Sequence, residues 1–193
     1  MGTAMKLRCL LLVFPILCVA AGLGLSAADL TDLARGDHGA APRVGPVPPA
    51  LRARLGLSPF YQKHLEVAGF PILGSTNVSD FALREAAWIV RNVVGERDDI
   101  LETMASNQVR LVVMAWNEYT TDVPEHSNLR SKVYWDRRAR GLGASRGNPV
   151  VSCAEENLLD YPNDPYATEN ILIHEFAHAI HGTAGEVLGE DFD

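Results

Sequence analysis

The chain has 193 residues, 47% of them hydrophobic and 21% charged, which suits one globular domain with accessory segments. Its formal net charge of −7 and its pI of about 5.3 argue against a nucleic-acid partner, because surfaces that bind nucleic acids are basic. The composition therefore favours a single folded domain and leaves enzymes and binding modules as open classes.

The first 28 residues are typical of a secretory signal peptide. Lys6 and Arg8 precede an apolar run over residues 9–25, and Ser26-Ala27-Ala28 supplies small residues suited to cleavage. The alternative is a membrane anchor, but the run is just short of a comfortable span. We therefore expect cleavage after Ala28, which leaves a secreted chain without a stable membrane span. Cleavage removes two of the 17 basic residues and none of the 24 acidic ones, so the mature net charge is about −9.

Signal removal also leaves Cys153 as the only cysteine of the mature chain. Such a residue could be free and buried, pair between chains, or have lost a partner. We favour a structural role for it. Asn77-Val78-Ser79 is a glycosylation acceptor in a host that glycosylates.

Residues 29–58 are rich in Ala, Pro, Gly and Arg, and they predict a flexible arm. Their proline-rich run over residues 41–49 cannot hold a helix or a central strand. The folded domain is expected to cover residues 59–193.

Helix and strand signals follow from Phe60 onwards. The first is an apolar stretch over residues 65–73, which predicts a strand broken at Pro71. Ser79 can cap a helix over residues 80–94, with Gly95 beyond its end. Six apolar positions of this helix form its expected buried side: Phe81, Leu83, Ala87, Trp88, Val90 and Val94.

The middle of the chain alternates between clear elements and polar excursions. Residues 97–105 predict a shorter helix, and residues 108–115 predict a strand that is β-branched and apolar at its centre. Residues 117–148 are polar and predict a surface loop, which could bind substrate. A short strand is expected over residues 148–153. The carboxylates of Glu155 and Glu156 would face opposite ways on a strand, so they are no obvious catalytic pair.

The last predicted element is an amphipathic helix that begins near Thr168 and runs to about His181, where Gly182 is a natural stop. Its expected apolar side consists of Ile173, Phe176, Ala177 and Ile180. Its polar side carries His174, His178 and His181.

This helix contains an H-E-x-x-H motif, His174-Glu175-Phe176-Ala177-His178. Histidines four residues apart share one helix face, about 6 Å apart along the axis, and can bind one zinc ion from the same side. Glu175 would then lie beside the open metal position, where it can take a proton from a bound water. The alternative is two exposed histidines on an ordinary helix.

Catalytic zinc usually takes a third protein ligand. His181 lies seven residues from His174, about 10.5 Å along the axis, which is too far for one straight helix to close on a single ion. We expect His181 either to face the substrate or to contact a metal ligand without binding the metal. The alternative is that it packs at the helix end. Glu186 is the best downstream candidate for the third ligand. The alternative is that Glu186, Glu190 and Asp191 form a solvated acidic tail.

Residues 170–181 resemble the active-site helix of the zincin metallopeptidases, and the Ala177-His178-Ala179 run looks most like gluzincins of the lethal-factor type. The resemblance implies an α+β fold, in which a mixed sheet accompanies the active-site helix and the strand over residues 109–115 borders the cleft. It also implies Zn2+ as cofactor, His174 and His178 as its ligands and Glu175 as general base. Gluzincins take their third ligand from a following helix, so the domain over residues 59–193 resembles one whose C-terminal part is missing.

Two functions follow from these observations. The first is a secreted zinc metallopeptidase that hydrolyses peptide or protein substrates through zinc-activated water, with Glu175 as base. The second is a non-catalytic extracellular module that retains the motif helix but lacks a third zinc ligand.

Overall fold

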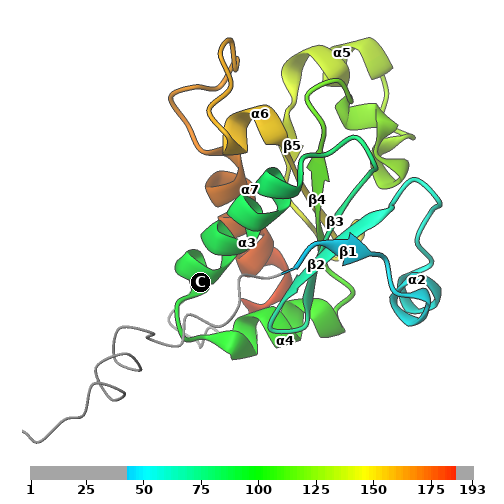
Figure 1. The fold of residues 1–193 in the computed structure, drawn as a ribbon, viewed down its shortest axis with the longest axis vertical. Coiled ribbons are helices and arrows are strands. Elements are labelled where there is room, and N and C mark those ends of the chain that lie inside the picture. The colour runs from blue at the N-terminus through cyan, green and yellow to red at the C-terminus, as the bar shows by residue number, and fades with distance from the viewer. Residues whose placement is uncertain (1–42, 186–193) are drawn as a thin grey trace, which may run out of the picture. The chain divides into compact units, whose positions relative to one another are not determined.

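A six-stranded mixed sheet organises residues 43–185, the part of the chain that this computed structural model describes (Figure 1). The strand order is β1-β2-β3-β4-β6-β5. Strands β3, β4 and β6 run parallel to one another, and the remaining pairs are antiparallel. This arrangement confirms the expected α+β class with a mixed sheet. The strands are β1 (Gly45–Pro46), β2 (Lys63–Val67), β3 (Phe70–Gly74), β4 (Arg110–Met114), β5 (Gly141–Leu142) and β6 (Val150–Ala154).

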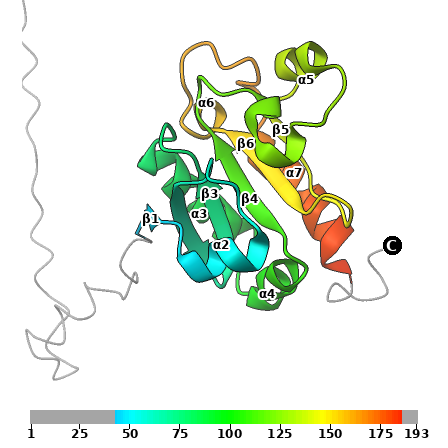
Figure 2. The ribbon, with the colours of Figure 1, turned by 90° about the vertical axis from the view of Figure 1, so that its right-hand side faces the viewer.

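Six α-helices accompany the sheet within the described residues: α2 (Pro49–Leu55), α3 (Asp80–Val94), α4 (Asp98–Ser106), α5 (Lys132–Arg138), α6 (Glu155–Leu158) and α7 (Ile171–Thr183). Figures 1 and 2 show α4 at the amino end of β4, and α5 and α6 beyond its carboxyl end. No helix between residues 43 and 185 is long and apolar enough to cross a membrane.

Some of the sequence predictions fall outside the described residues. These are the signal peptide over residues 1–28, the first part of the arm over residues 29–42, and the tail acids that include Glu186.

Two apolar cores lie on opposite faces of the sheet, because successive strand side chains alternate between faces. Leu111 and Val113 of β4 belong to the core beneath α3, α4 and α7. Val112 and Met114 belong to the core beneath α2. Figure 1 shows α2 on the side of the sheet away from α3 and α7.

The prediction of a flexible arm is wrong for its described part, residues 43–58. These residues form the edge strand β1 and the helix α2, and Leu51 is buried against the sheet. Pro49 occupies the first helical turn, where its missing N–H costs nothing. Arg52 fastens the segment by donating to the carbonyl oxygens of Ser58 and Tyr61. The prolines therefore start a helix and form an edge, rather than loosening the chain.

The break expected at Pro71 lies instead at Ala68-Gly69. Both residues have positive φ values, 46° and 78°, and they join β2 to β3 as a two-residue hairpin. Pro71 pairs with Glu66 inside β3, and the register with β4 begins only at Ile72. A residue without an N–H is tolerated at this position because no neighbouring strand pairs with it on the β4 side.

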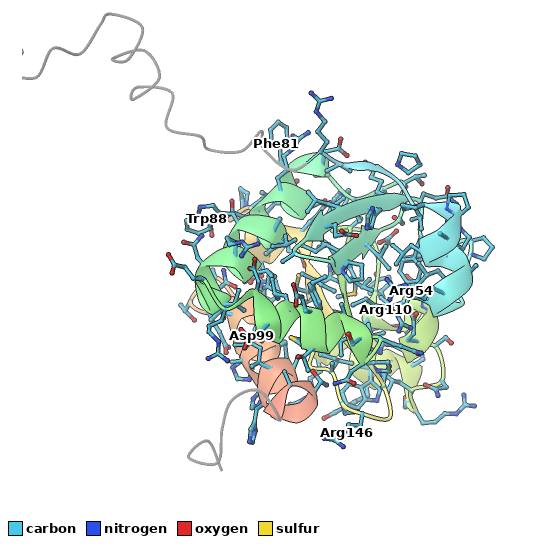
Figure 3. The ribbon with its side chains drawn as sticks, turned by 90° about the horizontal axis from the view of Figure 1, so that it is seen from below. Arg54, Phe81, Trp88, Asp99, Arg110 and Arg146 are labelled. Carbon is cyan, nitrogen blue, oxygen red and sulfur yellow. The ribbon has the colours of Figure 1, made fainter. Side chains whose placement is uncertain are left out.

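Helix α3 has the predicted bounds, with Ser79 as N-cap and Gly95 beyond its end. The prediction that Phe81 and Trp88 are buried is wrong. These side chains are 71% and 63% exposed, and Figure 3 shows them at the outer margin of the helix. The face that packs on the sheet is richer in alanine, namely Ala82, Leu83, Ala86, Ala87, Ile89, Val90 and Val94.

The excursion over residues 117–148 is not a plain surface loop. It contains two 3-10 helices (Thr120–Asp122 and Pro124–His126), the helix α5 and the edge strand β5. Val123 and His126 are buried. The polar composition was misleading because buried hydrogen bonds, such as the one between His126 and Ser152, satisfy these side chains.

Candidate functional site

Asn157 and Asn170 define the start of the motif helix. The side chain of Asn170 caps α7 by accepting from the N–H of Ile173 at 3.0 Å. Asn157 accepts from the N–H of Ile171 at 2.8 Å. The predicted N-cap at Thr168 is therefore wrong by two residues, and the helix continues past Gly182 to Thr183.

The prediction for the buried side of α7 is confirmed for Phe176 and Ile180 and wrong for Ile173 and Ala177. Ile173 and Ala177 are exposed, because the face of α7 that packs on β6 and α3 is rotated by one residue from the predicted face. The residues that it buries are Ile171, Leu172, Phe176, Ala179, Ile180 and Thr183. This rotation leaves the histidine side of the helix free of the core.

His174 and His178 are both exposed on that free side, as predicted for one helix face. Their ring centroids lie 4.9 Å apart, and the ring planes are inclined at 64°. Two imidazoles at this separation can approach one ion, and neutral imidazole is a good zinc ligand. His181 is exposed one turn further along the helix.

Glu169 holds His174 in one orientation. Its Oε1 lies 2.8 Å from Nδ1 of the imidazole. A carboxylate on Nδ1 favours the tautomer that has its proton there, which leaves Nε2 as the metal-binding atom. Sequence reasoning missed Glu169, because an acidic residue just before a helix resembles an ordinary residue of the first turn.

Glu175 lies half-buried on the same helix between the two histidines in sequence. Burial raises the pKa of its carboxyl group, while His174, His178 and a hydrogen bond from the N–H of Gly143 act in the opposite direction. A carboxylate with a raised pKa is better matched to taking a proton from water near neutral pH.

The edge strand β5 lies directly against this helix. A Cβ atom at Gly143 would stand 3.1 Å from Oε2 of Glu175, and one at Gly141 would collide with the side chain of Ile171. Glycines at both positions therefore allow β5 and the residue that follows it to contact α7. Helix α7 packs on β6 and β5, and β5 is the strand that lines the pocket beside the motif. The strand over residues 109–115, which was expected to border the cleft, corresponds to β4 in the interior of the sheet.

A pocket of about 470 Å³ opens where β5, α5 and α7 meet. Its lining combines the two motif residues His174 and Glu175 with Glu169 and Gly141, and it adds Trp135 and Tyr166 as aromatic walls. The hydroxyl of Tyr166 donates to the carbonyl oxygen of Arg138, so this tyrosine ties the residue 161–170 segment to the end of α5. His174 and Glu175 thus line a concave surface, as a substrate site requires.

The metal ligand set is incomplete among residues 43–185. No group of three His, Cys, Asp or Glu side chains there is close enough to hold a metal ion. Glu186, the predicted third ligand, lies outside the described residues. The two imidazoles and the adjacent carboxylate fit one side of a zinc site, and the rest of the coordination would come from elsewhere.

Cys153, Glu155 and Glu156, which the sequence analysis also considered, have structural roles in the fold. Cys153 is a free, buried cysteine in β6, and burial raises its thiol pKa, which fits the structural role favoured for it. Glu155 accepts from the N–H groups of Ser79 and Trp116, which fastens the loops after β3 and β4. Glu156 forms a two-pronged ion pair with Arg140, at 2.5 and 3.0 Å.

Comparison of the chain with models of protein families, with curated proteins and with solved structures found no match.

Proposed function

We propose that this protein is a secreted zinc metallopeptidase of the zincin type. The observation that carries the proposal is the pair His174 and His178, whose ring centroids lie 4.9 Å apart. The half-buried Glu175 follows His174 on the same helix, and His174 and Glu175 both line the pocket beside β5. The carboxylate of Glu169 on Nδ1 of His174 adds support, because it leaves the other ring nitrogen for a metal. Secretion rests on the sequence of residues 1–28 alone.

Zinc, when bound, would polarise a peptide carbonyl and lower the pKa of a bound water. In the proposed reaction Glu175 takes the proton of the attacking water and passes it to the leaving amine. The N–H of Gly143 holds this carboxylate in place. The peptide would lie along the outer edge of β5, where an extended chain can add to the sheet through backbone hydrogen bonds.

The second candidate is a non-catalytic extracellular module. One observation favours it: residues 43–185 supply no third metal ligand. In this case the motif helix would be retained as part of the fold, and the histidines would be ordinary exposed side chains.

Metal stoichiometry and peptide hydrolysis, measured on one preparation, separate the two candidates. The peptidase predicts close to one zinc per chain and hydrolysis of casein or a peptide mixture, with Glu175→Gln retaining the metal and losing activity by at least about a hundredfold. Glu102→Gln, an exposed change on α4, is the matched control and should leave both unchanged. The peptidase proposal fails if the protein binds no zinc at micromolar supply. The module proposal fails if zinc binds and the hydrolysis depends on Glu175.

A further inference from the structure

A second pocket, of about 440 Å³, lies at the carboxyl end of β4, next to the site described above. It is bounded by the loop after β4, which carries Trp116 and Tyr119, and by the turn over residues 161–165. Arg140 lines both this pocket and the pocket of the motif helix, so the two hollows adjoin on either side of one side chain.

Three aromatic side chains line the second pocket, and all three are at least partly exposed to solvent. Trp116 is 67% exposed, Tyr119 is 56% exposed, and Tyr161 is half-buried. The loop that carries Trp116 and Tyr119 is nevertheless held in place: the N–H of Trp116 donates to Glu155 at 3.0 Å and that of Tyr119 to Asp122 at 2.9 Å. Exposed aromatic rings on an anchored backbone are typical of a preorganised binding surface.

The charges around these rings are mainly negative. Arg140 is the cation of the lining, and its guanidinium is already neutralised by Glu156. Asp136 and Asp164 complete the charged lining and accept hydrogen bonds from neutral donors: Thr121 bonds to Asp136, while Asn157 and the N–H of Tyr166 bond to Asp164. No ion pair within residues 43–185 compensates either aspartate.

Aromatic faces and uncompensated carboxylates together select cations. The negative face of Trp or Tyr attracts a guanidinium or ammonium group, and a desolvated pair of this kind contributes up to about 2 kcal/mol. An anionic ligand would be repelled by Asp136 and Asp164. A neutral ligand of the same shape would still stack on the rings, but it would lack the electrostatic attraction to the rings and the carboxylates.

We propose that this second pocket binds an arginine or lysine side chain of the peptide whose scissile bond lies at Glu175. That the peptide is a substrate rests on the proposed function. The cation site itself rests on Trp116, Tyr119 and Asp136 and would remain if the chain had no peptidase activity.

The first test uses N-acetyl-arginine amide as the probe, and N-acetyl-citrulline amide as a control of the same shape without the charge. NMR signals of the indole N–H groups of the three tryptophans, assigned by substitution, follow binding to the full-length mature chain. We expect the arginine probe to shift the Trp116 signal in a saturable way, and citrulline to bind at least about fivefold more weakly. Equal binding of the two probes, or no shift at Trp116, would overturn the proposal.

Matched variants locate the probe. The backbone amide signal of Tyr119 follows binding when Trp116 is absent. Trp116→Ala should abolish the saturable shift of this amide signal, while Trp88→Ala, which changes a similarly exposed tryptophan on α3, should leave it unchanged. Asp136→Asn retains the aromatic rings, and it should weaken arginine binding about threefold without affecting citrulline. An unchanged arginine affinity in both pocket variants would contradict the proposed location.

The substrate part has its own readout, the sequence around the cleaved bonds in a peptide library. We expect arginine or lysine to be enriched at one fixed position from the cleavage site, and this enrichment to be lost among the bonds that Trp116→Ala still cleaves. Cleavage without any basic preference would refute the substrate part alone. Probe binding without cleavage would leave the cation site standing and would count against the peptidase.

Discussion

Oε1 of Glu169 lies 2.8 Å from Nδ1 of His174, immediately before the helix that carries the motif. The carboxylate therefore stands on the far side of the imidazole from the atom that would bind zinc. Such a partner fixes the tautomer and the ring orientation of a metal ligand. An exposed ion pair between these groups would add little stability, so its expected effect is on metal affinity.

We predict that Glu169→Gln weakens zinc binding about tenfold to a hundredfold with little change in folding stability. The amide can still accept a hydrogen bond, but it carries no charge to polarise the imidazole. Competition with a chromophoric chelator measures the affinity, and urea unfolding measures stability. Glu102→Gln, at an exposed position of α4, is the control. An affinity equal to that of the wild type would show that Glu169 does not support a metal ligand.

A second prediction concerns the contact between β5 and α7. Gly141→Ala would place a Cβ atom against Ile171 and 2.7 Å from the carbonyl oxygen of Ser152. We expect a loss of about 1–3 kcal/mol in the free energy of unfolding, because backbone and core must both shift. Gly147→Ala is the matched control, since its Cβ meets nothing within 4 Å. Urea unfolding of both variants decides, and equal stabilities would contradict the packing described.

The ion pair between Arg140 and Glu156 leads to a third prediction. Both side chains are only 11% exposed, and the guanidinium also donates to the carbonyl oxygens of Glu118 and Ala115. Arg140→Ala should therefore lower the free energy of unfolding by about 3–5 kcal/mol, because it leaves a buried carboxylate unpaired. Adding Glu156→Gln should recover part of this loss. A double variant no more stable than Arg140→Ala would argue against the unpaired charge as the cause.

Local signals in the sequence were enough for part of the fold. Ser79 and Gly95 predict the ends of α3 because a side-chain cap and a terminal glycine act within a few residues of their own position. The strand over residues 108–115 is recognisable from its β-branched centre for the same reason. Likewise, four-residue spacing alone places His174 and His178 on one face.

Features that depend on distant contacts were not predictable. Phe81 and Trp88 look like core residues, but the alanine-rich face of α3 packs more closely on the sheet. The proline-rich segment before Ser58 folds because Leu51 is buried in the core that also contains Val112 and Met114 of β4. The roles of Gly143 and Glu169 become visible only when β5 and the helix start are placed beside the motif.

Acid sensitivity of the fold gives the last prediction. His126 is buried, with Nε2 3.1 Å from Oγ of Ser152, and that hydroxyl also accepts from the N–H of Leu142 in β5. Burial lowers the pKa of His126, and Arg110 lowers it further, while Glu125 opposes them. The neutral imidazole, through Ser152, therefore connects the 3-10 helix over Pro124–His126 to the edge strand β5.

Because the folded pKa of His126 lies below its ordinary value of about 6.5, the unfolded chain binds a proton first as the pH falls. Stability from this group is present above about pH 6.5 and is lost progressively below it. His64, whose pKa is also lowered by burial, acts in the same direction. The raised pKa of Glu175 acts in the opposite direction from about pH 4.5 upwards, so the comparison is made in a Glu175→Gln background.

We expect His126→Gln to lower the free energy of unfolding at pH 7.5 and to flatten its decline between pH 7.5 and 5.5, because the variant has no imidazole to protonate. Glu102→Gln, at an exposed position of α4, is the control and should retain the full decline. Urea unfolding at the two pH values measures both. A decline as steep in His126→Gln as in its parent would mean that protonation of this ring does not limit the fold in acid.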